Sequence, residues 1–81
     1  MSGKTVNVEQ EIIAALREVA PEAETDELEG GVNLRDQIDM DSVDFLNFVT
    51  ALERRLDVKI PEQDYPKLSS LDGCRRYVAG A

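Results

Sequence analysis

The sequence IDMDSVDFLNFVTALERRL, residues 38–56, decides the fold of this chain. Its apolar residues recur every three or four positions, and at about 100° per residue most of them fall within one arc of a helical wheel. Alternation with a period of two is absent. We therefore predict an amphipathic helix that opens at Ser42 and is capped by the carboxylate of Asp41. Its core-facing stripe consists of Phe45, Phe48, Val49, Leu52 and Leu56.

Two apolar residues of this segment, Val43 and Leu46, fall on the opposite side of the wheel, where we expect water to reach them. Scattered exposed apolar residues are common on soluble proteins. The nearness of these two to Ser42 favours a second interpretation, in which they form a docking strip for a partner that visits the serine. Both interpretations stand at this point. The residues on or near this side are Val43, Leu46, Asn47, Thr50, Glu53 and Arg54.

Length and composition limit the architecture and the compartment. Eighty-one residues allow one domain, residues 1–81, with a small core. No apolar run approaches the roughly 18 residues needed to cross a membrane, and the first residues lack the apolar centre of a secretion signal. The single cysteine, Cys74, agrees with a reducing compartment and has the spacing of a buried residue. We expect a cytoplasmic monomer that does not bind membranes.

The net charge of −8 is concentrated in one segment. Residues 21–44 contain nine acids and one base, Arg35, whereas acids and bases cancel in the rest of the chain. This distribution argues against nucleic acid as a partner and in favour of a basic protein surface. The alternative is an acidic loop that serves only solubility.

The residues before this central helix predict one further helix and a long loop. Asn7 and Gln10 are typical of a capping box, which opens a helix through Ala20 that ends because Pro21 has no N–H to donate. Residues 22–40 have no sustained period and predict an ordered loop, with a short helical turn around residues 26–29 or 34–37. The helix should bury Val8, Ile12, Ala15, Leu16 and Val19, and the loop should be pinned down by Leu28, Val32, Leu34 and Ile38.

The residues after the central helix predict a short helix and a final longer one. Val58 and Ile60 should face the core, Pro61 suits the first position of a helix, and Pro66 keeps that helix short. Ser69 or Ser70 should cap the last helix, which ends at Gly80 and buries Leu71, Cys74 and Val78, with Tyr77 beside them. The fold we predict is all-α: a small four-helix bundle with three main helices, one short helix, and a long loop between the first and second helices.

Ser42 has two interpretations, a first-turn residue of the helix or a site of modification. The chain contains no histidine, so it has no obvious base to activate a serine, and another enzyme would have to do so. A helix N-terminus suits a phosphoester, because its free N–H groups favour a negative charge. We therefore expect no catalysis by the chain itself. We also expect no metal site, because Asp44 and Thr50 stand where a calcium loop needs glycine and glutamate.

The tetrapeptide Asp41-Ser42-Val43-Asp44 with its helix, the pair Ile60-Pro61, and the final helix with Tyr77-Val78 resemble the acyl carrier protein family over nearly the whole chain. The resemblance implies a carrier without catalytic activity. A phosphopantetheinyl transferase, with magnesium, would attach 4′-phosphopantetheine from coenzyme A to Ser42, next to the motif acid Asp41. The arm's thiol would hold acyl groups as thioesters and deliver them to acyl-loading and acyl-processing enzymes with basic docking surfaces.

The resemblance also implies two groups of residues that serve this task. Those meeting partner enzymes would be Asp39, Val43, Asp44, Leu46, Asn47, Thr50, Glu53 and Arg54. Those lining a shelter for the acyl chain would be Phe45, Phe48, Val49, Leu52, Ile60 and Leu68.

Three departures from the family's pattern bear on partner choice. Asp39 stands where glycine is frequent, Val43 where leucine is usual, and Arg54-Arg55 where carriers of fatty-acid synthases tend to be acidic. Reversed charge on a docking rim changes partner choice. The resemblance therefore implies a carrier of fatty-acid or of specialised acyl or polyketide-type biosynthesis, and on these departures we hypothesise the specialised pathway. The alternatives are a carrier-fold interaction subunit without the arm and an aminoacyl or peptidyl carrier of a nonribosomal pathway.

Overall fold

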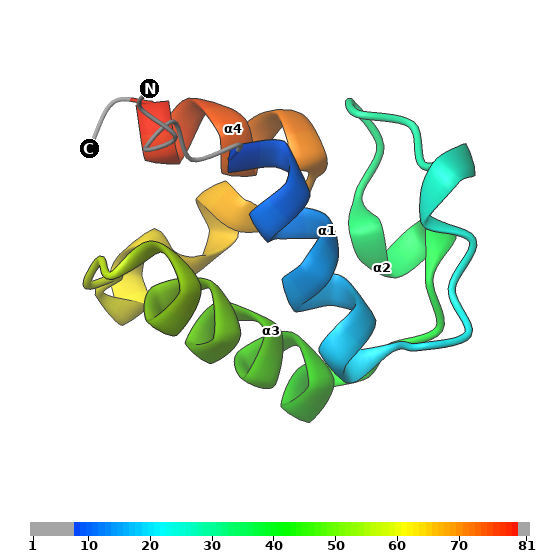
Figure 1. Cartoon of the computed structure of the whole chain (residues 1–81), viewed down its shortest axis with the longest axis horizontal. Helices are drawn as coiled ribbons and strands as arrows, with labels where there is room; N and C mark the ends of the chain where they lie inside the picture. Colours follow the sequence, from blue (N-terminus) through cyan, green and yellow to red (C-terminus); the bar gives the residue numbers. More distant parts are fainter. Residues whose placement is uncertain (1–7, 80–81) are drawn as a thin grey trace, which may run out of the picture.

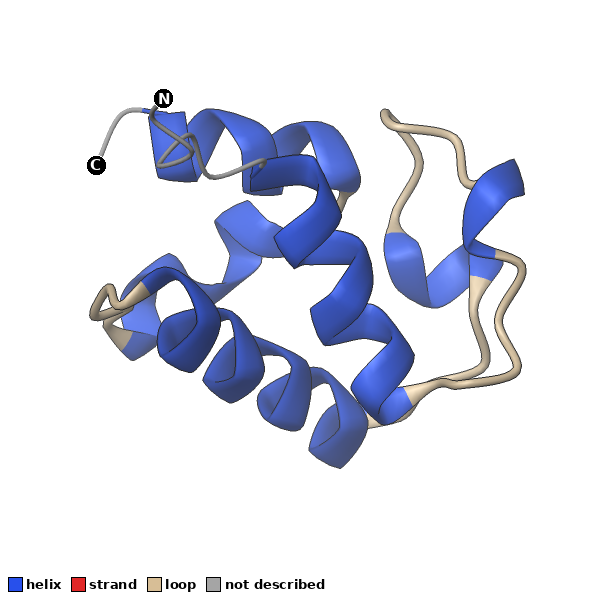
Figure 2. Cartoon of the chain, viewed as in Figure 1, coloured by secondary structure: helices blue, strands red, loops and turns tan. Residues whose placement is uncertain are grey.

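The computed structural model describes residues 8–79, and this part of the chain is helical without any strand. Figures 1 and 2 show the longer helices packed beside one another, with the connection between the first and second of them held to one side. The predicted all-α four-helix fold is confirmed. The one short helix of these four, at residues 62–68, is of the 3₁₀ type. The elements are α1 (Val8–Val19), η1 (Thr25–Glu27), α2 (Leu34–Gln37), α3 (Ser42–Leu56), η2 (Glu62–Leu68) and α4 (Leu71–Ala79).

One hydrophobic core connects these elements, and the most extensive helix contact is that of α1 with α3. Phe48 of α3 is the largest side chain that is fully buried. The predicted stripe of α3 is confirmed, with Phe45 and Leu56 half-buried at its margins. Ala51 also lies in the core, although the sequence did not single it out. The buried apolar residues are Ile12, Ala15, Leu16, Leu34, Ile38, Met40, Phe48, Val49, Ala51, Leu52, Ile60, Leu68, Leu71 and Cys74.

Helix α1 follows its prediction closely. It ends at Val19, one residue earlier than predicted, and the Ala20 N–H still donates to the Leu16 carbonyl at 2.8 Å. Val8 and Val19 are half-buried at the ends of the predicted stripe and pack against the core. The predicted cap at Asn7 lies outside the described residues.

A single short helical turn was predicted within the loop, at one of two places, and the structure has a turn at both: α2 has the predicted bounds, whereas η1 covers residues 25–27 rather than 26–29. Leu34 and Ile38 are buried and Leu28 is half-buried, but Val32 is 37% exposed, so its predicted role as a pin is wrong. The side chain of Gln37 closes this part of the loop instead. Its Oε1 accepts from the Glu29 N–H at 2.7 Å, and its Nε2 donates to the Glu29 and Val32 carbonyls at 3.0 Å.

The C-terminal part also follows the prediction, with small shifts. Ile60 is buried and Val58 is half-buried, whereas Pro61 is the extended residue before η2 rather than its first helical position. Ser70 caps α4, since its Oγ accepts from the Gly73 N–H at 3.0 Å. Val78 is only half-buried. Gly80 lies outside the described residues.

None of the helices in residues 8–79 is both long and apolar enough to cross a membrane.

Candidate functional site

The first turn of α3 presents Ser42 to solvent. Asp41 caps the helix, as predicted, because its Oδ1 accepts from the Asp44 N–H at 2.8 Å. The Asp44 carboxylate in turn accepts from the Asp41 N–H at 3.3 Å, which completes a capping box. Ser42 is therefore exposed and is not the cap, and its hydroxyl has no hydrogen-bond partner among residues 8–79. Only the Asp41 cap was predicted, although the spacing Asp41-x-x-Asp44 is that of a capping box.

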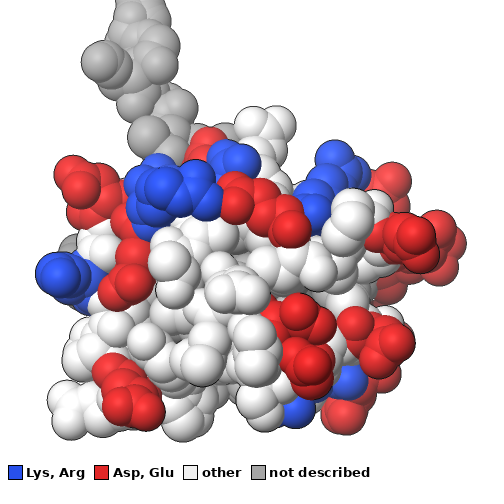
Figure 3. Space-filling view, turned by 90° about the horizontal axis from the view of Figure 1, so that it is seen from below, with Lys and Arg blue, Asp and Glu red and all other residues white. Residues whose placement is uncertain are grey.

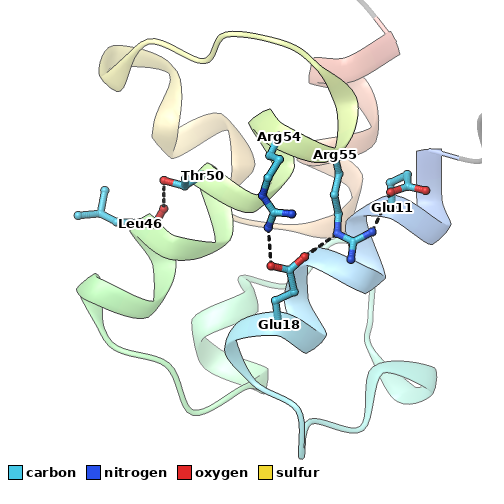
Figure 4. A network of polar contacts seen from close by, with 6 residues as sticks. All are labelled: Glu11, Glu18, Leu46, Thr50, Arg54 and Arg55. Carbon is cyan, nitrogen blue, oxygen red and sulfur yellow. Dashed lines mark hydrogen bonds and ion pairs between the residues drawn. The ribbon is translucent and has the colours of Figure 1, made fainter.

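Two apolar side chains beside Ser42 are exposed as predicted. Val43 is 62% and Leu46 is 46% exposed. They are the two most exposed of the large apolar residues in the described chain. Thr50 is also exposed, but its hydroxyl donates to the Leu46 carbonyl at 3.0 Å, within its own helix (Figure 4). We call Val43, Leu46 and Thr50 the α3 strip.

Charge is unevenly distributed around this strip. Figure 3 looks at the face on which α3 lies and shows a broad uncharged area. Acidic side chains gather on the side of the connection between α1 and α3, and acidic and basic side chains alternate along another edge. The face on which α3 lies is therefore largely uncharged, with a negative field beside it.

The C-terminal half of α3 is tied to α1 by ion pairs. Arg54 Nη2 lies 2.6 Å from Glu18 Oε1, Arg55 Nε lies 2.7 Å from Glu18 Oε2, and Arg55 Nη1 lies 3.1 Å from Glu11 Oε1 (Figure 4). The hydrogen bond from Arg55 is the largest cause of the lowered pKa of Glu18, and it outweighs the opposing effect of desolvation. Carboxylates of α1 therefore pair with both Arg54 and Arg55, so neither is an isolated surface charge.

Glu53, expected to meet partners, also has a structural contact. Its Oε2 accepts from the Ile60 N–H at 2.8 Å and so fixes the connector after α3. Asp39 and Asn47 are exposed, as a role in partner binding requires.

A groove of about 370 Å³ begins at Ser42. Its walls come from three elements: Phe45 and Leu46 of α3, Tyr65 and Pro66 of η2, and Arg35 of α2. Asn33 and Ser69 complete the lining. This groove could not be predicted from sequence, because its walls come from segments that are distant in sequence.

The residues expected to shelter an acyl chain are brought together in the core. Phe48, Val49, Leu52 and Leu68 are fully buried, and Ile60 is 4% exposed. Phe45 differs from them, because it is half-buried and also lines the groove. The rings of Phe45 and Phe48 lie 6.1 Å apart. Phe45 therefore stands between the groove and the core.

Cys74 is buried, as predicted, and does not belong to the site. Its thiol lies 3.4 Å from the Leu68 carbonyl, and desolvation raises its pKa to about 12. At neutral pH the thiol is protonated and unreactive. Residues 8–79 also contain no group of histidine, cysteine or acidic residues placed to hold a metal ion.

Comparison with known proteins agrees with this geometry. The chain matches the family described as "Phosphopantetheine attachment site" over residues 10–76. It is 33% identical to an acyl carrier protein of Beutenbergia cavernae over 76 residues. The aligned region covers 90% of this chain and 93% of the relative. Acyl carrier proteins of Kineococcus radiotolerans and Myxococcus xanthus are 29% and 28% identical, covering 90% and 89% of this chain and 94% and 95% of the relatives. No solved structure matches the chain.

The match to the attachment-site family covers most of the chain, and the first of these relatives is similar over nearly its whole length. Covalent 4′-phosphopantetheine is the prosthetic group of this family. An exposed serine hydroxyl that has no partner within the described residues, next to an open groove, can accommodate such a group. The chain therefore belongs to the acyl carrier protein family, whose members carry 4′-phosphopantetheine.

Proposed function

We propose that this chain is an acyl carrier whose 4′-phosphopantetheine arm is attached to Ser42. The observation that carries the proposal is the exposed Ser42 hydroxyl, which no residue of 8–79 engages because the Asp41–Asp44 box already caps the helix. The arm's terminal thiol supplies the chemistry, since it holds the acyl group as a thioester. The chain's own residues hold the arm, present it to enzymes and select those enzymes.

Attachment of the arm requires an external enzyme. Ser42 Oγ attacks the β-phosphorus of coenzyme A, the bond from that phosphorus to the bridging pyrophosphate oxygen breaks, and adenosine 3′,5′-bisphosphate leaves. The hydroxyl proton passes to a base of the transferase, because the chain has no histidine and its nearest carboxylates, Asp41 and Asp44, hold the capping box. The free N–H groups of the first turn of α3 favour the negative charge of the resulting phosphodiester.

The α3 strip is the proposed docking surface for the transferase and for acyl-loading and acyl-processing enzymes. Its apolar side chains offer area that can be desolvated, while Asp39 and the loop acids attract a basic surface. Arg54 contributes less to this charge pattern than its sequence position implies, because Glu18 pairs with it. The proposal of a specialised acyl pathway therefore rests on Asp39 and Val43, which stand where the family most often has glycine and leucine.

The experiment that tests the proposed function is an intact-mass measurement after incubation with coenzyme A, magnesium and a broad-specificity phosphopantetheinyl transferase. The wild type is expected to gain one phosphopantetheine, and Ser42→Ala is expected to gain none. Because Asp41 rather than Ser42 caps α3, Ser42→Ala is expected to melt like the wild type. Equal modification of both proteins would disprove attachment at Ser42. No gain by either, while a control carrier is modified, would instead favour the interaction subunit.

Leu46→Ala is expected to lower kcat/KM of the transferase by about fivefold, since truncation of an apolar interface residue costs about 1 kcal/mol. Val32→Ala is the matched control, because Val32 is also exposed but lies outside α3. The rates of modification are measured at equal protein concentrations. Equal losses in both variants would show that the α3 strip has no special role in docking.

A further inference from the structure

We propose that Arg35 pairs with the phosphodiester on Ser42 and so holds the first part of the arm in the groove between α3 and η2. Arg35 is here a positioning residue that binds the group without reacting with it. The inference rests on the proposed attachment at Ser42, and it adds where the attached arm rests and which side chain holds it there.

The charge of Arg35 is the first observation. It is the only basic residue in the segment 21–44, which contains nine acids. Within the described residues its side chain forms no ion pair or hydrogen bond with any of these acids. Arg17, by contrast, donates to Thr25, and Arg75 pairs with Asp72. The guanidinium of Arg35 is therefore available to an anion that arrives from outside.

The position of Arg35 is the second observation. Its own N–H donates to Asn33 Oδ1 at 2.8 Å, which fixes the first turn of α2. The neighbouring Leu34 is fully buried, and its N–H donates to the Ser69 carbonyl at 2.7 Å. These contacts anchor the backbone of α2 to the junction of η2 and α4. Arg35 consequently lies on the rim of the groove that begins at Ser42.

The chemistry of the groove is the third observation. A phosphodiester brings one negative charge to the start of α3, where the N–H groups of the first turn favour it but the surrounding acids repel it, so a nearby cation would offset that repulsion. A guanidinium can bind phosphate oxygens with two parallel hydrogen bonds. Beyond the phosphate, the groove is lined by Phe45, Leu46, Tyr65 and Pro66, which suit the arm's dimethyl and methylene groups. Asn33 and Ser69 offer polar groups to its amides.

The size of the effect follows from exposure. Arg35 is solvent-exposed, and exposed ion pairs contribute about 0.2–1 kcal/mol. That range corresponds to a change of about 1.4- to 5-fold in the ratio of docked to free arm. The arm therefore rests in the groove for part of the time and stays available to enzymes.

The test compares NMR spectra of the apo and modified forms of the ¹⁵N-labelled protein, with complete modification checked by intact mass. In the wild type, modification is expected to shift the Nε–Hε signal of Arg35 and the backbone amide signals of Tyr65 and Ser69. In Arg35→Gln the shifts at Tyr65 and Ser69 are expected to shrink, and in Arg35→Lys to be intermediate. Arg76→Gln removes the same charge from an exposed position of α4. Its shifts at Tyr65 and Ser69 on modification are expected to match those of the wild type.

The outcomes separate this inference from the proposed function. A wild type that gains no mass would refute both. A fully modified wild type whose Arg35 and Tyr65 signals stay unchanged would overturn only the inference, as would equal shifts in Arg35→Gln and Arg76→Gln. Failure of Arg35→Gln alone to be modified would also overturn it, because Arg35 would then serve recognition by the transferase. Loss of the wild-type shifts at high salt would support the ion pair.

Discussion

Phe48→Ala is expected to lower the free energy of unfolding by about 3–5 kcal/mol, because it removes a buried ring and leaves a cavity. Phe48 is the largest fully buried side chain, and its ring also lies 6.1 Å from that of Phe45. A domain of 81 residues has roughly 4–12 kcal/mol of total stability at typical values per residue. One substitution therefore removes a large part of the stability that keeps α3, and with it Ser42, in place.

Thermal and urea denaturation measure this effect. A loss of 1 kcal/mol lowers the Tm of a domain of this size by about 4–8 °C, so the Tm of Phe48→Ala should fall by roughly 12 °C or more. Val43→Ala is the matched control on the exposed side of the same helix and should change stability by no more than about 0.5 kcal/mol. A Phe48→Ala protein that melts like Val43→Ala would contradict the observed orientation of α3.

The orientation of α3 could be predicted from sequence because it depends on local information. The spacing of apolar residues fixes which face is buried, and Asp41 at the start fixes where the helix begins. For the same reason the exposed positions of Val43 and Leu46 were predicted correctly. The place of Ser42 in the first turn of α3 follows from the same features, since the cap is Asp41.

Other features depend on contacts between distant segments, which no local pattern contains. Arg54 and Arg55 meet Glu18 across 36 and 37 positions of sequence, so in isolation they resemble solvated charges. Met40 lies outside any periodic segment, yet it is buried because the chain just before α3 packs against the core. Val32 was wrongly expected to be buried, since the side chain of Gln37 rather than apolar contact closes its turn.

The groove beside Ser42 belongs to this second class. The sequence identified Arg35 only as the one base in an acidic segment. Its place on the groove depends on the hydrogen bond from Leu34 N–H to the Ser69 carbonyl, between residues 35 positions apart. That contact brings α2 beside η2, and only then do a cation, an apolar wall and the serine face the same space.

Gly73→Ala is expected to lower the free energy of unfolding by about 1–2 kcal/mol, although alanine favours an exposed helix by about 1 kcal/mol over glycine. A Cβ at Gly73 would overlap the carbonyl oxygen of Lys67, and it would lie 3.2 Å from Ser70 Oγ. The Lys67 carbonyl belongs to the backbone of η2, so relief requires η2 to move. Overpacking of this kind costs about 1–3 kcal/mol, and an overlap with backbone lies at the upper end because no side chain can rotate away.

Urea denaturation of Gly73→Ala and Gly31→Ala separates the steric overlap from the general effect of replacing glycine by alanine. A Cβ at Gly31 would meet its nearest neighbour, Asp72 Oδ2, at an ordinary 3.8 Å, so Gly31→Ala should stay within about 0.5 kcal/mol of the wild type. A Gly73→Ala protein more stable than the wild type would show that helix propensity outweighs the overlap. Because η2 also supplies Tyr65 and Pro66 to the groove, its displacement should shift the Tyr65 amide signal as well. The glycine thus permits the close approach of η2 to α4 on which the groove depends.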